Sequence, residues 1–320
     1  MTMSLLSVKN LTKSFTIDKT NWYGSGLREI MTAVDSISFD LERSELLGIL
    51  GANGAGKTTT IAMLLGILTP TSGSIVYFGK DFTRYRSEIF SKISFASGYL
   101  KLPARLTVWE NLDIIGRLYN MPHAIRLKKI EEMLSIFGIA HLKHRQTGPL
   151  SAGQMARLML AKAFLTDPEI VLLDEPTAPL DPEIAHEVRH FLLQEKKRRG
   201  VSFVFTSHNM DEVAYLCDRV LVFKNGCIVA NESPRVLAAS VQKSRLVILV
   251  TEGLDIAINL LKVKGLIFMV NDDKELVVES DEEHIALLLV DMARAGVLYV
   301  HLHIEKPTLN DYFLQLARQQ

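Results

Sequence analysis

The chain has 320 residues, of which 48% are hydrophobic, enough apolar material for one large domain and a second, smaller one. Lysine and arginine together number 36, as do aspartate and glutamate, so the formal net charge is zero. This balance gives no electrostatic reason to bind nucleic acid, and we expect no nucleic-acid partner.

The cysteines and the apolar stretches indicate the cellular setting of the protein and its relation to a membrane. Cys217 and Cys227 are the only cysteines, which excludes a disulfide framework and favours a reducing, cytoplasmic setting. No apolar stretch reaches the ~18 residues that a membrane-spanning helix needs. We therefore expect any membrane association to come through a partner.

The first quarter of the chain predicts strand, loop and helix in that order. Residues 7–17 alternate polar and apolar side chains as a half-buried strand does, and residues 33–42 predict a second strand. A glycine- and serine-rich loop at 22–26 lies between them. The apolar run 46–50 predicts a buried strand, and apolar residues recur at helical spacing over 57–68.

The middle of the chain predicts helices and then an alternation of strands and helices. Helical patterns cover 107–119 and 124–139, and a third helix begins near Leu150. Short, fully apolar strands follow at 170–173 and 201–206. Such strands alternating with helices predict an α/β fold with a largely parallel sheet covered on both faces.

A domain boundary is predicted near 234–244, which gives a first domain of residues 1–238 and a second of 239–320. The second domain predicts a β-α-β-β-α-β order, typical of a small α+β ferredoxin-like domain, closed by a helix near 309–317. The elements expected in it are strand 246–250, helix 255–263, strands 266–270 and 276–279, helix 282–295 and strand 297–304.

The strand at 46–50 leads directly into a phosphate-binding motif. The sequence from Gly51 to Thr58 satisfies G-x-x-x-x-G-K-[ST] between a strand and a helix, where backbone N–H groups and a helix N-terminus can surround phosphate oxygens. Lys57 is expected to bridge the β- and γ-phosphates of ATP, and Thr58 to ligate Mg²⁺. The predicted ATP-binding residues of this loop are Gly51, Ala52, Asn53, Gly54, Ala55, Gly56, Lys57, Thr58 and Thr59.

Two carboxylates end the buried strand 170–173. Parallel α/β sheets build their sites at the carboxyl edge of the strands, where Asp174 and Glu175 fall. Alone, such a pair is more often a helix cap than a catalytic pair. With a phosphate loop upstream, Asp174 is expected to hold Mg²⁺ and Glu175 to polarise the attacking water as general base.

These motifs together resemble the nucleotide-binding subunit of an ABC transporter. Leu150 opens the sequence Leu-Ser-Ala-Gly-Gln, which is similar to the LSGGQ signature of that family with Ala152 in place of the first glycine. The resemblance implies that Ser151, Ala152, Gly153 and Gln154 face the ATP of an opposing subunit at a helix N-terminus. It further implies that Asp181 belongs to the D-loop and that His208 is the switch histidine contacting the γ-phosphate.

The resemblance also implies a fold, cofactors and partners. The expected fold is a P-loop NTPase with a RecA-like core and a helical subdomain at about 100–165, and the expected activity is hydrolysis of ATP with Mg²⁺. The expected partners are a second ATPase subunit, as a homodimer, and an integral-membrane permease. The chain would then lie peripherally on the inner face of the cell membrane.

Two positions depart from the pattern of this family. The glutamine of the Q-loop is replaced, with Ser97 or Gly98 in its place, so the rate of hydrolysis and its coupling to a permease are open. The aromatic side chain that stacks on adenine is also open: Phe15 fits the usual position, and Tyr23 or Trp22 in the insertion are alternatives.

The class of transporter and two rival functions are also open. Residues 305–313 resemble the terminal helix of exporters of the daunorubicin-resistance type, which implies export. One rival is a soluble ABC ATPase of translation or DNA maintenance, although such chains usually carry two cassettes. The other rival is an ATP-binding subunit with little catalysis, which the missing glutamine suggests.

Overall fold

The structure is a computed structural model that describes residues 4–20, 26–97, 102–241, 244–271 and 274–318. The chain divides into two compact units, Met1–Ser233 and Pro234–Gln320. The division falls within a few residues of the boundary expected after residue 238. Among the described residues, no helix combines the length and the apolar character needed to cross a lipid bilayer.

The first unit contains a six-stranded sheet in the order β10-β9-β3-β8-β7-β6. Its five strands from β9 to β6 run parallel, and β10 pairs antiparallel with β9 at one edge. The strands are β3 (Leu46–Gly51), β6 (Ile93–Ser97), β7 (Ile170–Asp174), β8 (Ser202–Thr206), β9 (Arg219–Lys224) and β10 (Cys227–Glu232). Because the central strands are apolar on both faces, the parallel sheet is buried as the sequence predicts.

A four-stranded antiparallel sheet in the order β2-β1-β4-β5 completes the strands of this unit. Its members are β1 (Leu6–Thr20), β2 (Gly26–Leu41), β4 (Ser72–Tyr77) and β5 (Lys80–Asp81). Apolar side chains of β1, such as Leu6 and Val8, share one buried cluster with Ile49 of β3 and Val204 of β8. The core of the unit therefore includes side chains of both sheets.

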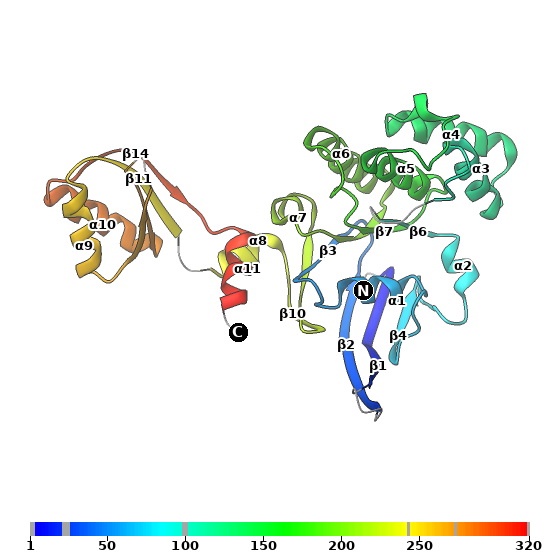
Figure 1. Ribbon diagram of the computed structural model, residues 1–320, viewed down its shortest axis with the longest axis horizontal. Helices are drawn as coiled ribbons and strands as arrows, with labels where there is room; N and C mark the ends of the chain where they lie inside the picture. The colour runs from blue at the N-terminus through cyan, green and yellow to red at the C-terminus, as the bar shows by residue number, and fades with distance from the viewer. Residues whose placement is uncertain (1–3, 21–25, 98–101, 242–243, 272–273, 319–320) are drawn as a thin grey trace. The chain divides into compact units, whose positions relative to one another are not determined.

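The hairpin of β1 and β2 is longer than the sequence predicts. The second strand was expected at 33–42, but β2 starts at Gly26, which pairs with Thr20. Strand β4 pairs with β1 only over Leu6–Thr12, so the far part of the hairpin projects beyond its neighbour (Figure 1). The pairing therefore continues along a two-stranded ribbon as far as Thr20 and Gly26, because continued backbone pairing satisfies N–H and C=O groups. Residues 22–25 of the expected loop lie outside the described residues.

Helix α1 (Lys57–Leu64) follows the phosphate loop and ends earlier than the predicted 57–68. Gly66 adopts φ 64°. The Gly66 N–H donates to Met63 O at 3.0 Å and the Ile67 N–H to Ala62 O at 2.9 Å. This pair of hydrogen bonds is a Schellman motif, which ends a helix despite continued apolar spacing.

The other helices of the first unit lie at the ends of the parallel strands or in a helical subdomain. They are α2 (Arg86–Phe90), α3 (Val108–Leu118), α4 (His123–Ile136), the 3-10 turn η1 (Ala140–Leu142), α5 (Ala152–Phe164), α6 (Pro182–Arg199) and α7 (Met210–Leu216). Figure 1 shows α3, α4, α5 and α6 grouped on one side of the six-stranded sheet. The helical subdomain expected at about 100–165 corresponds to α3, α4, η1 and α5.

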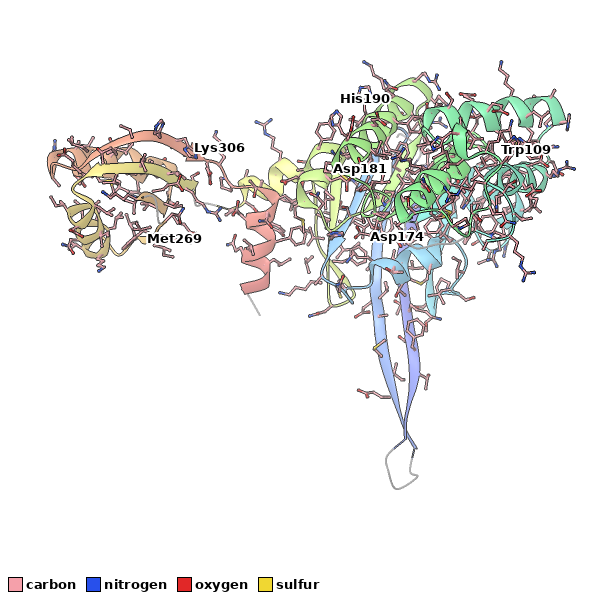
Figure 2. All side chains as sticks on the ribbon, turned by 45° about the horizontal axis from the view of Figure 1, so that its top comes forward. Trp109, Asp174, Asp181, His190, Met269 and Lys306 are labelled. Atoms are coloured by element: carbon pink, nitrogen blue, oxygen red, sulfur yellow. The ribbon has the colours of Figure 1, made fainter. Side chains whose placement is uncertain are left out.

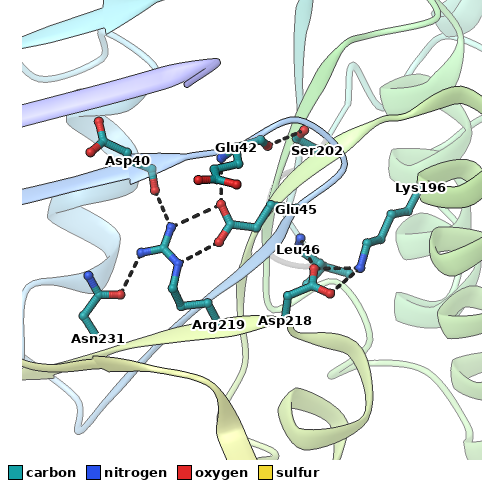
Figure 3. Close-up of polar contacts among 9 residues, drawn as sticks. All are labelled: Asp40, Glu42, Glu45, Leu46, Lys196, Ser202, Asp218, Arg219 and Asn231. Carbon is teal, nitrogen blue, oxygen red and sulfur yellow. Dashed lines mark hydrogen bonds and ion pairs between the residues drawn. The ribbon is translucent and has the colours of Figure 1, made fainter. Parts of the chain in front are cut away.

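Arg219 connects both sheets at the amino end of the parallel strands (Figure 3). Its guanidinium donates to the Glu45 carboxylate at 2.7 Å, to Asp40 O at 2.7 Å and to Asn231 Oδ1 at 2.7 Å. Asp40 belongs to β2 and Asn231 to β10, so one side chain holds three segments together. This cluster lies at the end of the sheet opposite to the phosphate loop.

The second unit contains an antiparallel sheet in the order β12-β13-β11-β14 with two helices in the β-α-β-β-α-β order. Its elements are α8 (Pro234–Ala239), β11 (Ser244–Glu252), α9 (Leu254–Val263), β12 (Ile267–Val270), β13 (Glu275–Ser280), α10 (Glu282–Arg294), β14 (Leu298–Glu305) and α11 (Leu309–Arg318). Leu246, Ile248 and Leu261 belong to its own buried cluster. Arg245 pairs with Asp311 at 2.6 Å and so ties β11 to α11.

Candidate functional site

The phosphate loop lies between β3 and α1, as the motif requires. Gly56 has φ 105°, and a Cβ at this position would lie 2.6 Å from Ala33 O, so only glycine fits without rearrangement. Lys57 Nζ donates to Gly51 O at 2.6 Å and to Ala52 O at 3.1 Å. The ammonium is thus held across the mouth of its own loop, where the partial charge of the α1 N-terminus also favours an anion.

Two carboxylates act on the electrostatics of Lys57. Partial burial lowers the pKa of the Lys57 ammonium, while the charges of Glu175 and Asp174 oppose that shift. Lys57 begins α1, which follows β3, whereas Asp174 ends β7 and Glu175 comes directly after it. The sheet therefore brings opposite charges to one edge. The Lys57 ammonium therefore donates hydrogen bonds to loop carbonyls and is also stabilised by the charges of two carboxylates.

The carboxyl ends of β7 and β8 form the next part of the site. Asp174 ends β7 and pairs in register with Thr206 of β8 on one side and Ser97 of β6 on the other. Thr206 Oγ1 donates to Asp174 Oδ1 at 2.6 Å. It also accepts the Glu175 N–H at 3.1 Å, so this buried hydroxyl positions both acidic residues.

Glu175 and His208 meet across the ends of these two strands. His208 Nδ1 lies 2.7 Å from Glu175 Oε2. Glu175 has φ 49°, a left-handed conformation that is uncommon for a residue other than glycine. Strain of this kind gathers at functional sites, where the surrounding structure holds it.

One cavity of about 700 Å³ brings several of the predicted site residues together. The side chains that line it come from the phosphate loop, α1, its following turn, β6, β7 and the segment after β8. They are Asn53, Lys57, Thr58, Ile61, Ala62, Leu65, Ile67, Phe95, Ser97, Asp174, Glu175 and His208. The cavity thus combines an ammonium, hydroxyls, two carboxylates and an imidazole above an apolar wall.

The signature residues begin helix α5 and do not line this cavity. Ser151 Oγ accepts the Gln154 N–H at 3.2 Å, and Gln154 Oε1 accepts the Ser151 N–H at 3.1 Å. These reciprocal bonds form a capping box. Ala152 is exposed in the first turn of the helix, where a methyl group in place of the glycine hydrogen meets no steric conflict.

Asp181, which was expected to belong to the D-loop, caps another helix and is labelled in Figure 2. Its Oδ1 accepts the Ile184 N–H at 3.0 Å at the start of α6. Arg157 of α5 lies 3.8 Å from Asp181 Oδ2, and a Cβ at Gly153 would meet Pro179 O at 3.5 Å. The start of α5 and the D-loop are therefore neighbours.

The candidates for adenine stacking and for the Q-loop position are only partly within the residues that the structure describes. Phe15 lies on β1 opposite Met31, with Lys13 Nζ 5.1 Å from its ring centroid, and it does not line the cavity. The alternatives to Phe15, which are Tyr23 and Trp22, lie outside the described residues, as does Gly98. Ser97, the other candidate for the Q-loop position, is buried and lines the cavity beside Asp174.

Sequence reasoning missed Thr206 and the apolar cavity wall of Ile67 and Phe95. Thr206 ends the strand next to Asp174, and a hydroxyl residue at that strand end was the signal that could have found it. The wall residues carry no motif, and only the packing of β6 and α1 brings them to the cavity.

Known protein families and sequences match most of the first unit. The family profile described as "ABC transporter" matches residues 34–178, and a profile described as "AAA domain, putative AbiEii toxin, Type IV TA system" matches residues 145–214. The chain is 36% identical over 203 residues to the ABC transporter ATP-binding protein NatA of Bacillus subtilis, covering 63% of this chain and 82% of NatA. It is 29% identical over 294 residues to the linearmycin resistance ATP-binding protein LnrL of the same organism, covering 89% of this chain and 94% of LnrL.

Solved structures show the same fold. The dimeric ATP-binding cassette MJ0796 bound to ADP and Pi aligns with a TM-score of 0.64 at 23% identity, covering 71% of this chain and 98% of that one. The cbiO1 subunit of Clostridium perfringens aligns with a TM-score of 0.60 at 28% identity, covering 74% of this chain and 91% of that one. The chain therefore belongs to the ATP-binding proteins of ABC transporters, the ATPase subunits that power membrane transport.

Proposed function

We propose that the chain is the ATP-hydrolysing subunit of an exporter similar to the daunorubicin-resistance type, working as a homodimer that closes on two ATP molecules. The observation that carries the assignment of the site is the single cavity lined by Lys57, Thr58, Asp174, Glu175 and His208. An ammonium, a hydroxyl, two carboxylates and an imidazole around one cavity provide the groups that positioning and electrostatic stabilisation of a phosphoryl group require.

The phosphate loop binds the triphosphate of ATP in this proposal. Its N–H groups and the N-terminus of α1 surround phosphate oxygens, and Lys57 bridges the β- and γ-phosphates. Phe15 is the proposed stacking partner of adenine, with Tyr23 as the alternative. The proposed binding residues of the loop are Gly51, Ala52, Asn53, Gly54, Ala55, Gly56, Lys57, Thr58 and Thr59.

The oxygen atoms of Thr58 and Asp174 suit a magnesium ion. Both side chains line the same cavity, and Thr58 is exposed. Hydroxyl and carboxylate oxygens are the hard donors that Mg²⁺ prefers. When bound there, the ion would neutralise charge on the phosphate oxygens. Thr206 holds Asp174 in place by its hydrogen bond to Oδ1.

Glu175 is the proposed general base, and His208 is the proposed contact to the γ-phosphate. Only one Glu175 oxygen, Oε2, contacts His208, which leaves Oε1 to accept a proton from the attacking water. Ser97 replaces the missing Q-loop glutamine in this proposal, because it lines the cavity in register with Asp174. A hydroxyl is shorter than an amide side chain, so water would complete its reach.

In this proposal the second subunit completes the site with its signature residues. Ser151 and the following residues Ala152, Gly153 and Gln154 would face the γ-phosphate bound to the opposing subunit, with Asp181 at the same boundary. The dimeric form of MJ0796 supports this arrangement at the level of the fold. ATP binding drives closure because it favours the closed state over the open one.

Similarity over nearly the whole chain supports export. The match to LnrL, a linearmycin resistance protein, spans 89% of this chain and so continues into the second unit. The match to the methionine import protein MetN of Geobacillus kaustophilus spans 62% of this chain. In this proposal residues 239–320 form a ferredoxin-like accessory domain, and a permease holds the dimer at the inner face of the cell membrane.

Nucleotide-driven pairing tests the proposed activity. Purified protein is mixed with MgATP, and phosphate release, ATP binding and molecular mass are measured for wild type, Glu175→Gln and Glu183→Gln. Glu183 is exposed in the first turn of α6, so it is the matched control. Glu175→Gln should bind ATP, accumulate as a dimer and lose phosphate release by at least about 10²-fold. Normal turnover in Glu175→Gln, or ATP binding without pairing, would remove the proposal.

Isolation of the partner tests the proposed class. Tagged Glu175→Gln protein is purified from detergent-solubilised membranes and, in parallel, from the ribosome and nucleoid fractions of the same cells. An exporter subunit should be recovered with a polytopic membrane protein whose addition changes the rate of phosphate release. Recovery with ribosomes or DNA would instead favour the soluble class, and absence of phosphate release with the permease present would favour binding without catalysis.

A further inference from the structure

Glu212 is a buried carboxylate next to the site that the proposed mechanism does not use. It lies on α7 with 4% of its surface exposed. Its Oε2 accepts the hydroxyl of Thr177 at 2.8 Å and the hydroxyl of Ser207 at 2.9 Å. Burial of a carboxylate is costly unless hydrogen bonds compensate it, so these two contacts decide where Glu212 and its donors can lie.

The two donors belong to the segments that carry Glu175 and His208. Thr177 follows Glu175 by two positions, after β7, and Ser207 directly precedes His208, after β8. The same oxygen atom of Glu212 therefore fastens both segments. A shift of either segment would stretch a short hydrogen bond to a charged acceptor, which is stronger than a bond between neutral groups.

The backbone of Glu175 needs such support. Its φ of 49° is a strained conformation that persists only when the surroundings fix it. On the strand side, the Glu175 N–H donates to Thr206 O and Oγ1, each at 3.1 Å. On the other side, the bond from Thr177 to Glu212 fixes the chain.

His208 depends on its loop for its position. Its side chain is 73% exposed, so little packing restrains the ring directly. Ser207 Oγ accepts the Asn209 N–H at 3.1 Å while it donates to Glu212. Asn209 Oδ1 in turn accepts the N–H groups of Asp211 and Glu212, each at 3.1 Å. Glu212 thereby closes the loop that presents His208.

The second oxygen of Glu212 faces a further element. Oε1 accepts no hydrogen bond from the part of the chain that the structure describes, and Arg189 Nη1 lies 3.7 Å away. Arg189 belongs to α6, whose first turn is capped by Asp181. The Arg189 guanidinium of α6 therefore compensates the charge of the Glu212 carboxylate.

We infer that Glu212 is a positioning residue of the ATPase site proposed above, which sets the separation between Glu175 and His208 by holding Thr177 and Ser207 together. Its removal should impair hydrolysis through His208 and leave nucleotide binding at the phosphate loop intact. The inference rests on the proposed roles of Glu175 and His208.

A double-mutant cycle on the full-length protein tests this route. Steady-state ATPase rates are measured for Glu212→Leu, which removes the accepting oxygen, for His208→Ala and for the double variant, with Asp211→Asn as the adjacent, exposed control. Glu212→Leu should lower kcat at least about 10-fold with KM for ATP within about 2-fold, and it should cost clearly less in the His208→Ala background. Asp211→Asn should keep the wild-type rate. An equal loss in both backgrounds, or an unchanged kcat, would overturn the inference.

Thr177 supplies a second, gentler test if Glu212→Leu folds poorly. Thr177→Val removes the hydroxyl with little change of volume and should lower kcat, while Thr177→Ser keeps the donor and should restore it. Equal rates in both variants would contradict the inference. Full activity of His208→Ala and Glu175→Gln would mean that the proposed site itself is wrong, whereas their inactivity with additive Glu212 effects would reject the positioning role alone.

Discussion

His208 Nδ1 lies 2.7 Å from Glu175 Oε2, although the two residues are 33 positions apart. Their strands explain the contact: β7 and β8 are parallel neighbours, and Asp174 and Thr206 pair at their carboxyl ends. Each side chain follows closely after that pair. The imidazole thereby fixes one oxygen of the proposed base, and this pair is the part of the site most open to direct test.

Removal of the imidazole should affect turnover more than binding. His208→Ala leaves the phosphate loop unchanged but frees the Glu175 carboxylate and removes the proposed γ-phosphate contact. We expect kcat to fall about 10²-fold with KM for ATP nearly unchanged. Steady-state phosphate release measures both constants. His186→Ala, on the exposed side of α6, is the control, and equal rates in the two variants would remove His208 from the site.

Thr206 should control the use of magnesium. Thr206→Val removes the donor to Asp174 Oδ1 and one acceptor of the Glu175 N–H, in a position that is fully buried. Groups that orient metal ligands are typically worth about 10–100-fold in metal affinity. We expect the Mg²⁺ concentration for half-maximal rate to rise by such a factor in Thr206→Val but not in Thr206→Ser. An unchanged magnesium dependence in Thr206→Val would contradict the role of Asp174.

The signature serine can be separated from its capping role. Ser151→Ala removes both the cap of α5 and the hydroxyl proposed to face the opposing ATP, and the cap alone contributes about 1 kcal/mol. Thr107 and Glu110 form the same capping box on α3, so Thr107→Ala is a matched loss of stability. Melting temperature and ATPase rate should both fall in Ser151→Ala, but only the melting temperature should fall in Thr107→Ala. Parallel behaviour of the two variants would reduce Ser151 to a cap.

Arg219 should contribute to stability and not to chemistry. Its guanidinium bonds to Glu45, Asp40 and Asn231 far from the cavity, and Glu45 is buried (Figure 3). Arg219→Ala leaves that carboxylate with the Glu42 N–H as a donor but without its cationic partner, which should cost about 2–3 kcal/mol. Urea unfolding measures the loss. Arg43→Ala, which removes an exposed ion pair with Glu169, should cost less than about 1 kcal/mol.

The helical subdomain should lose stability in acid through Asp113. Burial acts to raise the pKa of this carboxyl, but hydrogen bonds from Arg117 and Arg126, together with their charges, outweigh burial and hold the pKa below its usual value. Because the folded pKa is the lower one, the stabilisation is complete above the unfolded value and is lost as pH falls through the folded value. The difference in unfolding free energy between wild type and Asp113→Asn should stay constant from neutral pH to about pH 5 and shrink below about pH 4. A difference that is independent of pH would contradict this.

The sequence alone was sufficient for the parts of the site that lie in continuous stretches. The loop from Gly51 to Thr58 folds between a strand and a helix because glycines permit its turns, and Asp174 follows a strand whose apolar residues demand burial on both faces. His208 came from the resemblance to ABC transporter subunits, because its place after a strand would not by itself have singled it out. In each case the chemistry depends on the local backbone, which neighbouring residues specify.

The tertiary structure decided what depends on residues far apart in the chain. The hydrogen bonds between Thr206 and Asp174 and between Thr177 and Glu212 join segments that are far apart in the chain. No sequence pattern around either residue of a pair predicts its partner. The start of β2 at Gly26 likewise follows from pairing with β1 and not from its own alternation. Local sequence selects backbone conformations, whereas burial and hydrogen bonding across the sheet select which side chains meet, and only the folded chain satisfies both.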